Sequence, residues 1–138
     1  MNTNKLTIKA QEALADMQTI AGEHQQQELA PEHLLAALLN QKDGVVPAIT
    51  EKMQLTAVLK KNIEEEIAKR PQVSGGHAYL SSALEKVFSA AEKEAKKLKD
   101  DFVSTEHLLL GIMDEGTSAA AVLLKKNAVS KDQILQAL

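Results

Sequence analysis

The sequence predicts an all-α fold of eight helices, arranged as two tandem repeats of four helices. First, residues 104–113 (STEHLLLGIM) repeat residues 30–39 (APEHLLAALL) at an offset of 74 residues, which is 107 minus 33. Second, apolar residues recur at the three- and four-residue spacing of amphipathic helices along most of the chain. Third, no stretch shows the sustained apolar and polar alternation of a strand, so we expect no β-sheet.

The repeat extends well beyond these two segments. At the same offset, Thr7 aligns with Ser81 and Leu29 aligns with Val103. The shared Glu-His pair is the most informative part, because the packing of an apolar helix face does not require it. We therefore expect repeat 1 over residues 1–70, a linker over 71–79 and repeat 2 over 80–138, with the repeats related by a pseudo-twofold axis.

The first two helices have clear start and stop signals. Thr7 is expected to cap a helix that ends near Gly22. A polar loop rich in glutamine follows over residues 23–29. Pro31 suits the first position of the second helix, because its missing N–H would have no partner there, and Asp43 with Gly44 is expected to end that helix.

The remaining helices of repeat 1 lead into the linker. Pro47 fits the first turn of a short third helix, and Thr56 is expected to cap the fourth. The acidic run Glu64, Glu65 and Glu66 is interpreted as the solvated face of this helix, with a docking patch as the alternative. Residues 71–77 (PQVSGGH) cannot continue a helix, because proline lacks a donor and paired glycines are costly to order.

Repeat 2 carries its own capping signals. Ser82 and Glu85 are expected to form a capping box for the fifth helix. Ser104 is expected to cap the sixth, residues 117–118 to open the seventh, and Ser130 to begin the eighth. This gives four helices in each repeat.

Composition limits the classes of function. The chain of 138 residues and 15.0 kDa has the length of one domain. It contains no cysteine, which fits a reducing compartment, and we expect a cytoplasmic protein. We also expect neither a signal peptide nor a membrane span, because the first residues lead into an amphipathic pattern and no apolar run has membrane-spanning length. The net charge of -3 and an aromatic content of 2% offer little to nucleic acid, so we expect neither a membrane nor a nucleic acid as partner.

The candidates for chemistry are the four histidines and their neighbouring carboxylates, namely His24, His33, His77 and His107. Adjacent Glu and His side chains on a helix point about 100° apart, so we expect no metal site. Glu32 and Glu106 are explained by the helix dipole, and His33 and His107 as partly buried residues with one ring nitrogen bonded to backbone. No phosphate-binding loop or nucleophile elbow is present, so we expect a binding module without catalytic residues, and not a free-standing helical enzyme.

Residues 7–14 (TIKAQEAL) are similar to the T-x-x-A-Q-x-A-L opening of a known family, the duplicated Clp N-terminal repeat domain. Both Glu-His-Leu-Leu boxes resemble its repeat signature, and the resemblance covers the whole chain. In this family the domain precedes the ATPase modules of Clp-type AAA+ unfoldases. The joint at residues 70–81 resembles the disaggregase branch more than the protease-coupled branches.

The resemblance implies a substrate-binding domain that captures unfolded or aggregated polypeptides and delivers them to a homohexameric AAA+ motor. The alternative is an adaptor-docking domain of a protease-coupled unfoldase. The resemblance implies no cofactor for this fragment, and we expect the fragment to be a monomer. ATP and Mg²⁺ would act in the ATPase modules of the parent protein, and the parent would cooperate with an Hsp70-type chaperone system.

The resemblance also implies a substrate-binding surface. Its residues would be Thr7, Asp100, Asp101, Glu106, Phe88 and Ala90. The family has one acidic position where this sequence has two neighbouring aspartates, so both are candidates. Phe88 and Ala90 correspond to apolar groove residues. Thr7 also suits a plain N-cap worth about 1 kcal/mol, and the two roles are compatible.

Overall fold

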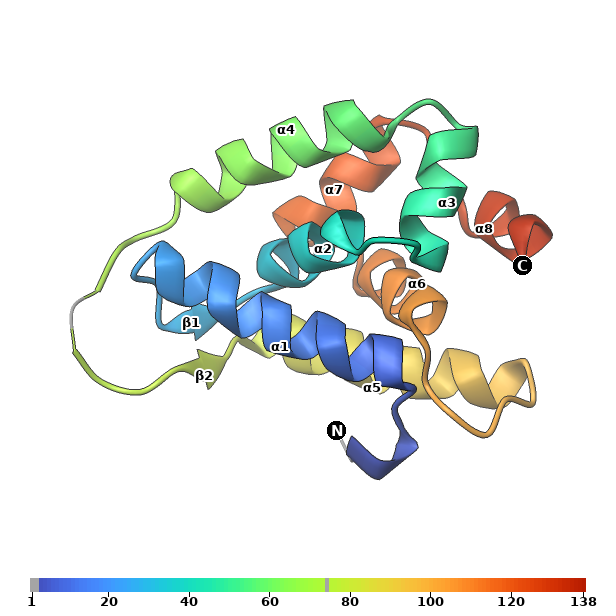
Figure 1. Ribbon diagram of the computed structural model, residues 1–138, viewed down its shortest axis with the longest axis horizontal. Coiled ribbons are helices and arrows are strands. Elements are labelled where there is room, and N and C mark those ends of the chain that lie inside the picture. The colour runs from blue at the N-terminus through green and yellow to red at the C-terminus, as the bar shows by residue number, and fades with distance from the viewer. Residues whose placement is uncertain (1–2, 74) are drawn as a thin grey trace.

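The computed structural model describes residues 3–73 and 75–138, so Ser74 of the predicted linker and the first two residues lie outside the described part. Within it, the chain forms one short 3-10 helix, eight α-helices and two short β-strands (Figure 1). In chain order these are η1 (Thr3–Lys5), α1 (Ile8–Glu23), β1 (Glu28–Leu29), α2 (Pro31–Asn40), α3 (Val45–Lys52), α4 (Thr56–Ala68), β2 (Tyr79–Leu80), α5 (Ser82–Lys97), α6 (Thr105–Glu115), α7 (Ala119–Lys126) and α8 (Lys131–Ala137).

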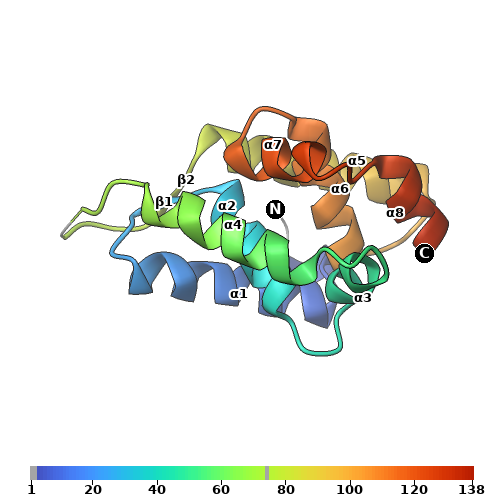
Figure 2. The same cartoon turned by 90° about the horizontal axis from the view of Figure 1, so that it is seen from above.

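The helices pack in a reciprocal arrangement. Within the repeats, α1 packs against α2 and α5 packs against α6. Between the repeats, α2 contacts α7 while α6 contacts α3, and α2 and α6 also touch each other. Figure 2 shows α1 and α3 on one side of the molecule and α5 and α7 on the other. The helices that carry the two Glu-His segments are therefore the central ones.

Local structure recurs at the sequence offset of 74 residues. The hydroxyls of Thr7 and Ser81 each accept a hydrogen bond from the backbone N–H three residues later, at 3.1 and 3.0 Å. The loops after α1 and α5 each contain one left-handed residue, Gln25 with φ of 54° and Lys99 with φ of 60°. The predicted all-α class with eight helices is confirmed for the described residues.

The expectation of no β-sheet was wrong. Strands β1 and β2 pair in parallel, with Leu29 opposite Leu80, and a parallel bridge joins Leu6 to Val103. These two pairings exchange places at the repeat offset, because 6 plus 74 is 80 and 29 plus 74 is 103. A two-residue strand is too short to show alternation, so no sequence pattern indicates it.

Two predicted caps lie one residue away from the observed ones. Ser81 caps α5 through its hydroxyl, and Ser82 is already the first helical residue. Leu55 precedes α4, and the hydroxyl of Thr56 instead makes a 2.6 Å hydrogen bond with that of Thr50. Helix boundaries depend on the dihedral angles of one residue, which composition does not determine.

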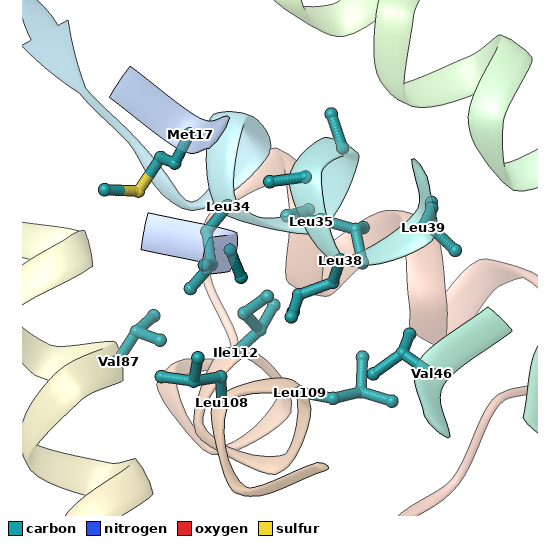
Figure 3. Close-up of a cluster of buried hydrophobic side chains, with 14 of the residues drawn as sticks. Met17, Leu34, Leu35, Leu38, Leu39, Val46, Val87, Leu108, Leu109 and Ile112 are labelled. Carbon is teal, nitrogen blue, oxygen red and sulfur yellow. The ribbon is translucent and has the colours of Figure 1, made fainter. Parts of the chain in front are cut away.

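The hydrophobic core lies between the two central helices (Figure 3). Leu34 from α2 and Leu108 from α6 are both fully buried, as their apolar spacing predicts. Val87 from α5 and Val46 from α3 extend this cluster toward the neighbouring helices. One continuous core therefore supports the first turn of both α2 and α6.

Candidate functional site

Both histidines of the repeated segments fold back on the residue that precedes their helix. The backbone N–H of Ala30 donates to Nδ1 of His33 at 3.0 Å, and the N–H of Ser104 donates to Nδ1 of His107 at 2.8 Å. Each bond satisfies a backbone donor at a helix start. Since Nδ1 accepts, the ring proton lies on Nε2. The prediction of a ring nitrogen bonded to backbone is confirmed, and both rings are buried.

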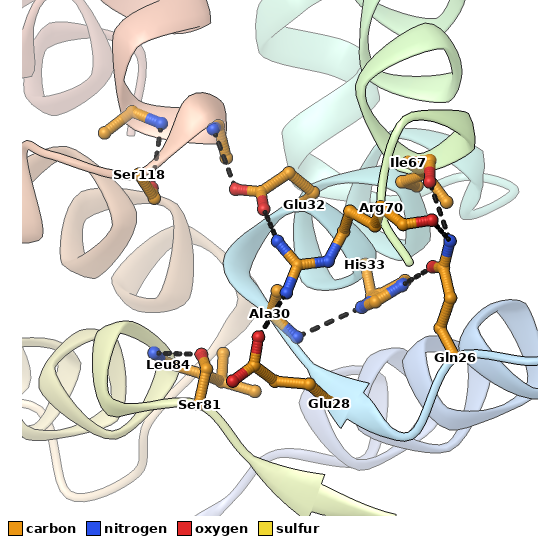
Figure 4. Close-up of polar contacts among 12 residues, drawn as sticks. Gln26, Glu28, Ala30, Glu32, His33, Ile67, Arg70, Ser81, Leu84 and Ser118 are labelled. Carbon is orange, nitrogen blue, oxygen red and sulfur yellow. Dashed lines mark hydrogen bonds and ion pairs between the residues drawn. The ribbon is translucent and has the colours of Figure 1, made fainter. Parts of the chain in front are cut away.

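In repeat 1, the other ring nitrogen is used inside the protein (Figure 4). Nε2 of His33 donates to Oε1 of Gln26 at 2.6 Å, and the amide of Gln26 donates to the carbonyl of Ile67 at 2.8 Å. Burial, with the positive charge of Arg70 and the nearby His24, lowers the pKa of His33 to about 4. His33 therefore remains neutral at physiological pH.

The carboxylate of Glu32 joins the two repeats. One oxygen accepts from Nη1 of Arg70 at 2.9 Å, and the other accepts from the backbone N–H of Ala120 at the start of α7, at 3.0 Å. Nη2 of Arg70 donates to Glu28 at 2.6 Å. The Glu32 side chain is only 4% exposed, so this group is part of the structure and not an open site.

In repeat 2, the same segment faces a different environment. Nε2 of His107 lies 2.9 Å from a carboxylate oxygen of Asp100, which occupies the position of Gln26 in the other repeat. Asp100 and Asp101 are exposed and Glu106 is half-buried. The side chain of Phe102 between them is 51% exposed. Repeat 2 therefore presents carboxylates and an aromatic ring to solvent.

The structure brings four of the six predicted site residues together. Thr7, Asp100, Asp101 and Glu106 line one shallow hollow of about 320 Å³. We call it the acidic hollow, and its remaining lining residues are Phe102, Ser104 and His107. Because Thr7 comes from repeat 1, the surface depends on contact between the repeats. Thr7 reaches it through the backbone bond from its N–H to the carbonyl of Val103, at 3.0 Å.

The other two predicted residues lie elsewhere. Phe88 is only 7% exposed and belongs to the hydrophobic core. Ala90 lines a separate hollow between α5 and the end of α6, beside Lys93 and Asp114. The expectation that both line one surface with the acidic residues is therefore not met by the geometry, because positions 88 and 90 point to different faces of one helix.

A second hollow, of about 360 Å³, adjoins the acidic one and was missed in the sequence. The two hollows share Asp100, Asp101 and Phe102, and the second is also lined by Lys5, Glu92, Ala95, Lys96 and Val103. One signal could have identified Phe102, because at the repeat offset it takes the place of the charged Glu28. The nearness of Lys5 could not be read from the sequence, since it depends on the parallel bridge between Leu6 and Val103.

A second charged cluster holds the last helix in place. Nζ of Lys131 in α8 lies 2.5 Å from Glu94 and 3.1 Å from Asp114. Burial and the neighbouring Glu94 carboxyl raise the pKa of Asp114. The pKa of Glu94 is lowered by its hydrogen bond with Asp114 and by the cation of Lys131. Among the described residues, no group of three or more His, Asp or Glu side chains is placed to hold a metal ion.

Comparison with known proteins assigns this chain to a family. The model of the Clp repeat (R) N-terminal domain matches residues 5–127, most of the chain. The chain belongs to the Clp N-terminal domain family. A Clp N-terminal domain is a non-catalytic module, as predicted for this fragment.

Curated relatives of this Clp N-terminal domain carry the name chaperone protein ClpB. The protein from Bacillus cereus is 38% identical over 144 residues, covering 100% of this chain and 16% of that protein. The protein from Porphyromonas gingivalis is 38% identical over 137 residues, covering 99% of this chain and 16% of that protein. The chain thus spans about one sixth of the length of the curated relatives it matches.

A solved structure shares the fold. The Hsp104 N-terminal domain from Candida albicans matches with a TM-score of 0.74 at 19% sequence identity, covering 96% of this chain and 88% of that one.

Among the described residues, none of the helices alone combines the length and the apolar composition that a membrane span needs. Helices α6 and α7 together have the required length and composition, but the chain bends by 94° between them.

Proposed function

We propose that this Clp N-terminal domain captures exposed segments of unfolded or aggregated polypeptides, as the substrate-binding domain of a ClpB-like disaggregase. The observation that carries the proposal is the acidic hollow with the exposed ring of Phe102. Thr7, Asp100, Asp101 and Glu106 surround a solvent-exposed Phe102 that is shared with the second hollow. Apolar contact is non-directional, and carboxylates attract basic segments over a range of positions, so such a surface suits varied clients.

The size of the surface favours weak and reversible capture. The two hollows, of about 320 and 360 Å³, are shallow and open, so a bound segment keeps contact with solvent. Weak binding suits a domain that passes its client onward. The name of the curated relatives, chaperone protein ClpB, supports this function. Adaptor docking in a protease-coupled unfoldase is the alternative.

We further propose that the motor lies outside this chain. ATP and Mg²⁺ would act in AAA+ modules that follow Leu138 in a homohexameric parent protein, which would work with an Hsp70-type system in the cytoplasm. Reading the remainder of the gene tests this proposal. A disaggregase requires two ATPase modules and a coiled-coil insertion long enough for a middle domain, whereas a protease-coupled unfoldase lacks that long insertion.

The decisive experiment is an NMR titration of the domain with a reduced and alkylated, permanently unfolded protein. We expect the wild type to show shifts at the amides of residues 100–107, and the double variant Thr7→Ala with Glu106→Ala to bind at least about fivefold more weakly. The control is Glu64→Ala, which removes an exposed carboxylate of α4 that does not line the acidic hollow. Equal binding by the double variant and the wild type would remove these residues from the site.

A further inference from the structure

Helix α4 carries an exposed ridge that the proposed function does not use. The buried side chain of Ile63 faces the core. At about 100° per residue, positions 58, 61, 65 and 68 lie on the opposite side of the helix. We call these residues, Val58, Lys61, Glu65 and Ala68, the α4 ridge, and all four are exposed. In Figure 1, α4 lies at the upper edge of the molecule, with no other element beyond it. The ridge is therefore open to a partner.

The chemistry of the α4 ridge is complementary to itself in the antiparallel direction. From its first to its last residue, the ridge presents an apolar side chain, a cation, an anion and an apolar side chain. Both pairs are centred on position 63, since 61 and 65 lie two residues from it and 58 and 68 lie five. In an antiparallel pair of α4 helices, Lys61 of each copy lies opposite Glu65 of the other, and Val58 lies opposite Ala68. A twofold axis therefore makes each of these contacts twice.

The two charges of the ridge are not paired within the chain. Lys61 and Glu65 stand four residues apart, yet their charged groups form no hydrogen bond or ion pair with each other or with another described residue. By contrast, Nζ of the neighbouring Lys69 lies 2.9 Å from a carboxylate oxygen of Glu66. On a helix, lysine before glutamate is the less favourable order for such a pair. Both charges are thus available to a second copy.

A hollow beside the ridge extends the possible contact. It has a volume of about 520 Å³ and lies between α4 and α7, where Glu65 lines it together with Val122. The Val122 side chain is 51% exposed. A lysine that reaches Glu65 from outside can lay its methylene groups over this apolar side chain while its ammonium group meets the carboxylate. In the antiparallel pair, Lys61 of the second copy lies opposite Glu65 and can make this contact.

We propose that the α4 ridge is a contact surface for a second copy of this chain, with the two α4 helices antiparallel about a twofold axis at position 63. One helix from each copy buries less area than the roughly 1,200–2,000 Å² of a stable complex. The dimer is therefore weak, with a Kd on the order of 1 mM, and it replaces the strict monomer expected from the resemblance. The acidic hollow is not lined by any ridge residue, so the dimer and client capture are independent.

Cysteine cross-linking tests the antiparallel register, because the chain contains no cysteine of its own. Val58→Cys and Ala68→Cys are made as separate variants. Like positions in the dimer lie about 15 Å apart, too far for a disulfide, whereas positions 58 and 68 face each other. We expect mild oxidation of the equimolar mixture to give the mixed dimer, identified by mass spectrometry, and each variant alone to give almost none.

The matched control for random collision is Val58→Cys mixed with Ser89→Cys, which places the second thiol at an exposed position of α5. All three substitutions are at exposed positions, and the amide spectrum of each variant verifies that its fold is intact. A mixed dimer of positions 58 and 68 that is no more abundant than this control overturns the proposal. Equal cross-linking of the Val58→Cys variant with itself also overturns it, because that outcome requires a parallel pair.

Charge reversal tests the chemistry of the contact. As the 138-residue chain is diluted from about 1 mM to about 0.05 mM, we expect the amides of residues 58–68 to shift. Lys61→Glu should weaken self-association at least about tenfold, because like charges then face each other. Adding Glu65→Lys should restore it, since exchanging both charges preserves the complementarity. Glu64→Gln, on the side of the helix, is the control and should behave like the wild type. No shifts on dilution, or no rescue by the second substitution, overturns the proposal.

Discussion

In repeat 1 the carboxylate of Glu32 is buried between Arg70 and the first turn of α7, whereas its counterpart Glu106 in repeat 2 is half-buried and lines an open hollow. The two segments share the Glu-His sequence and the same backbone bond to the histidine. They differ in their partners, because the position seven residues before the histidine holds Gln26 in one repeat and Asp100 in the other. The helix start is thus the same in both repeats, while the surroundings of one copy are structural and those of the other are exposed.

The largest expected effect tests whether the two central helices contribute equally to the hydrophobic core. Leu34→Ala and Leu108→Ala should each lower the free energy of unfolding by about 2 to 5 kcal/mol, because both side chains are fully buried and leave a cavity. Urea denaturation of each variant gives the value. A small effect of either substitution would show that its helix face is not in the core.

The second prediction uses the pH dependence of stability to test the burial of His33. The pKa of His33 is about 4 in the folded protein, against about 6.5 in the unfolded chain. The unfolded state therefore binds more protons between these values, so the contribution of His33 is complete above pH 6.5 and is lost as the pH falls to 4. The total is about 3 kcal/mol, measurable from denaturation midpoints along this pH range.

The origin of this acid sensitivity can be assigned directly. The ring protons of His33, followed by NMR, should titrate near pH 4. Titration near pH 6.5 would mean that the ring is hydrated, in conflict with its burial beneath Gln26.

The third prediction contrasts the two glutamates. Glu32→Gln should cost about 2 kcal/mol, because charge-assisted bonds from Arg70 and from the N–H of Ala120 are weakened in a buried place. Glu106→Gln should change stability by less than about 0.5 kcal/mol, since no described residue bonds to it. Thermal unfolding of both variants makes the comparison. Equal losses would show that the two environments are alike.

The fourth prediction concerns the caps that the repeats share. Thr7→Ala and Ser81→Ala each remove one hydroxyl that accepts a backbone N–H, so each should cost about 1 kcal/mol. Only Thr7→Ala should also weaken the binding of unfolded protein, because Thr7 lines the acidic hollow and Ser81 does not. If both variants bind clients equally well, Thr7 acts only as a cap.

Internal repetition made the fold accessible from sequence alone. The offset of 74 residues, the Glu-His segments and the apolar spacing were sufficient to predict the eight helices. The division into two repeats stays a prediction, which the shared helix caps support. The resemblance placed Thr7, Asp100, Asp101 and Glu106 on one surface, and the structure does bring them together. Phe88 shows the limit, because helical spacing alone does not decide whether an apolar side chain faces the core or a groove.

The contacts of single residues were beyond prediction. The ion pairs of Arg70 join the segment after α4 to β1 and α2, and these contacts depend on tertiary packing between segments about 40 residues apart. The short strands and the bridge between Leu6 and Val103 were missed for the same reason, since each pairs residues that lie far apart in the sequence. Sequence patterns report local periodicity, and these contacts have none.

The reciprocal pairing of Leu6 with Val103 and of Leu29 with Leu80 has a consequence for how this chain could be divided. Each half contributes extended segments whose backbone pairing partners lie in the other half. This arrangement resembles an isologous dimer whose two subunits are joined covalently. A protease cut in the glycine-containing loop at residues 75–76 should therefore leave a nicked but intact particle. Either fragment alone would lack its complement, and mixing the two should restore the native assembly without a peptide bond between them.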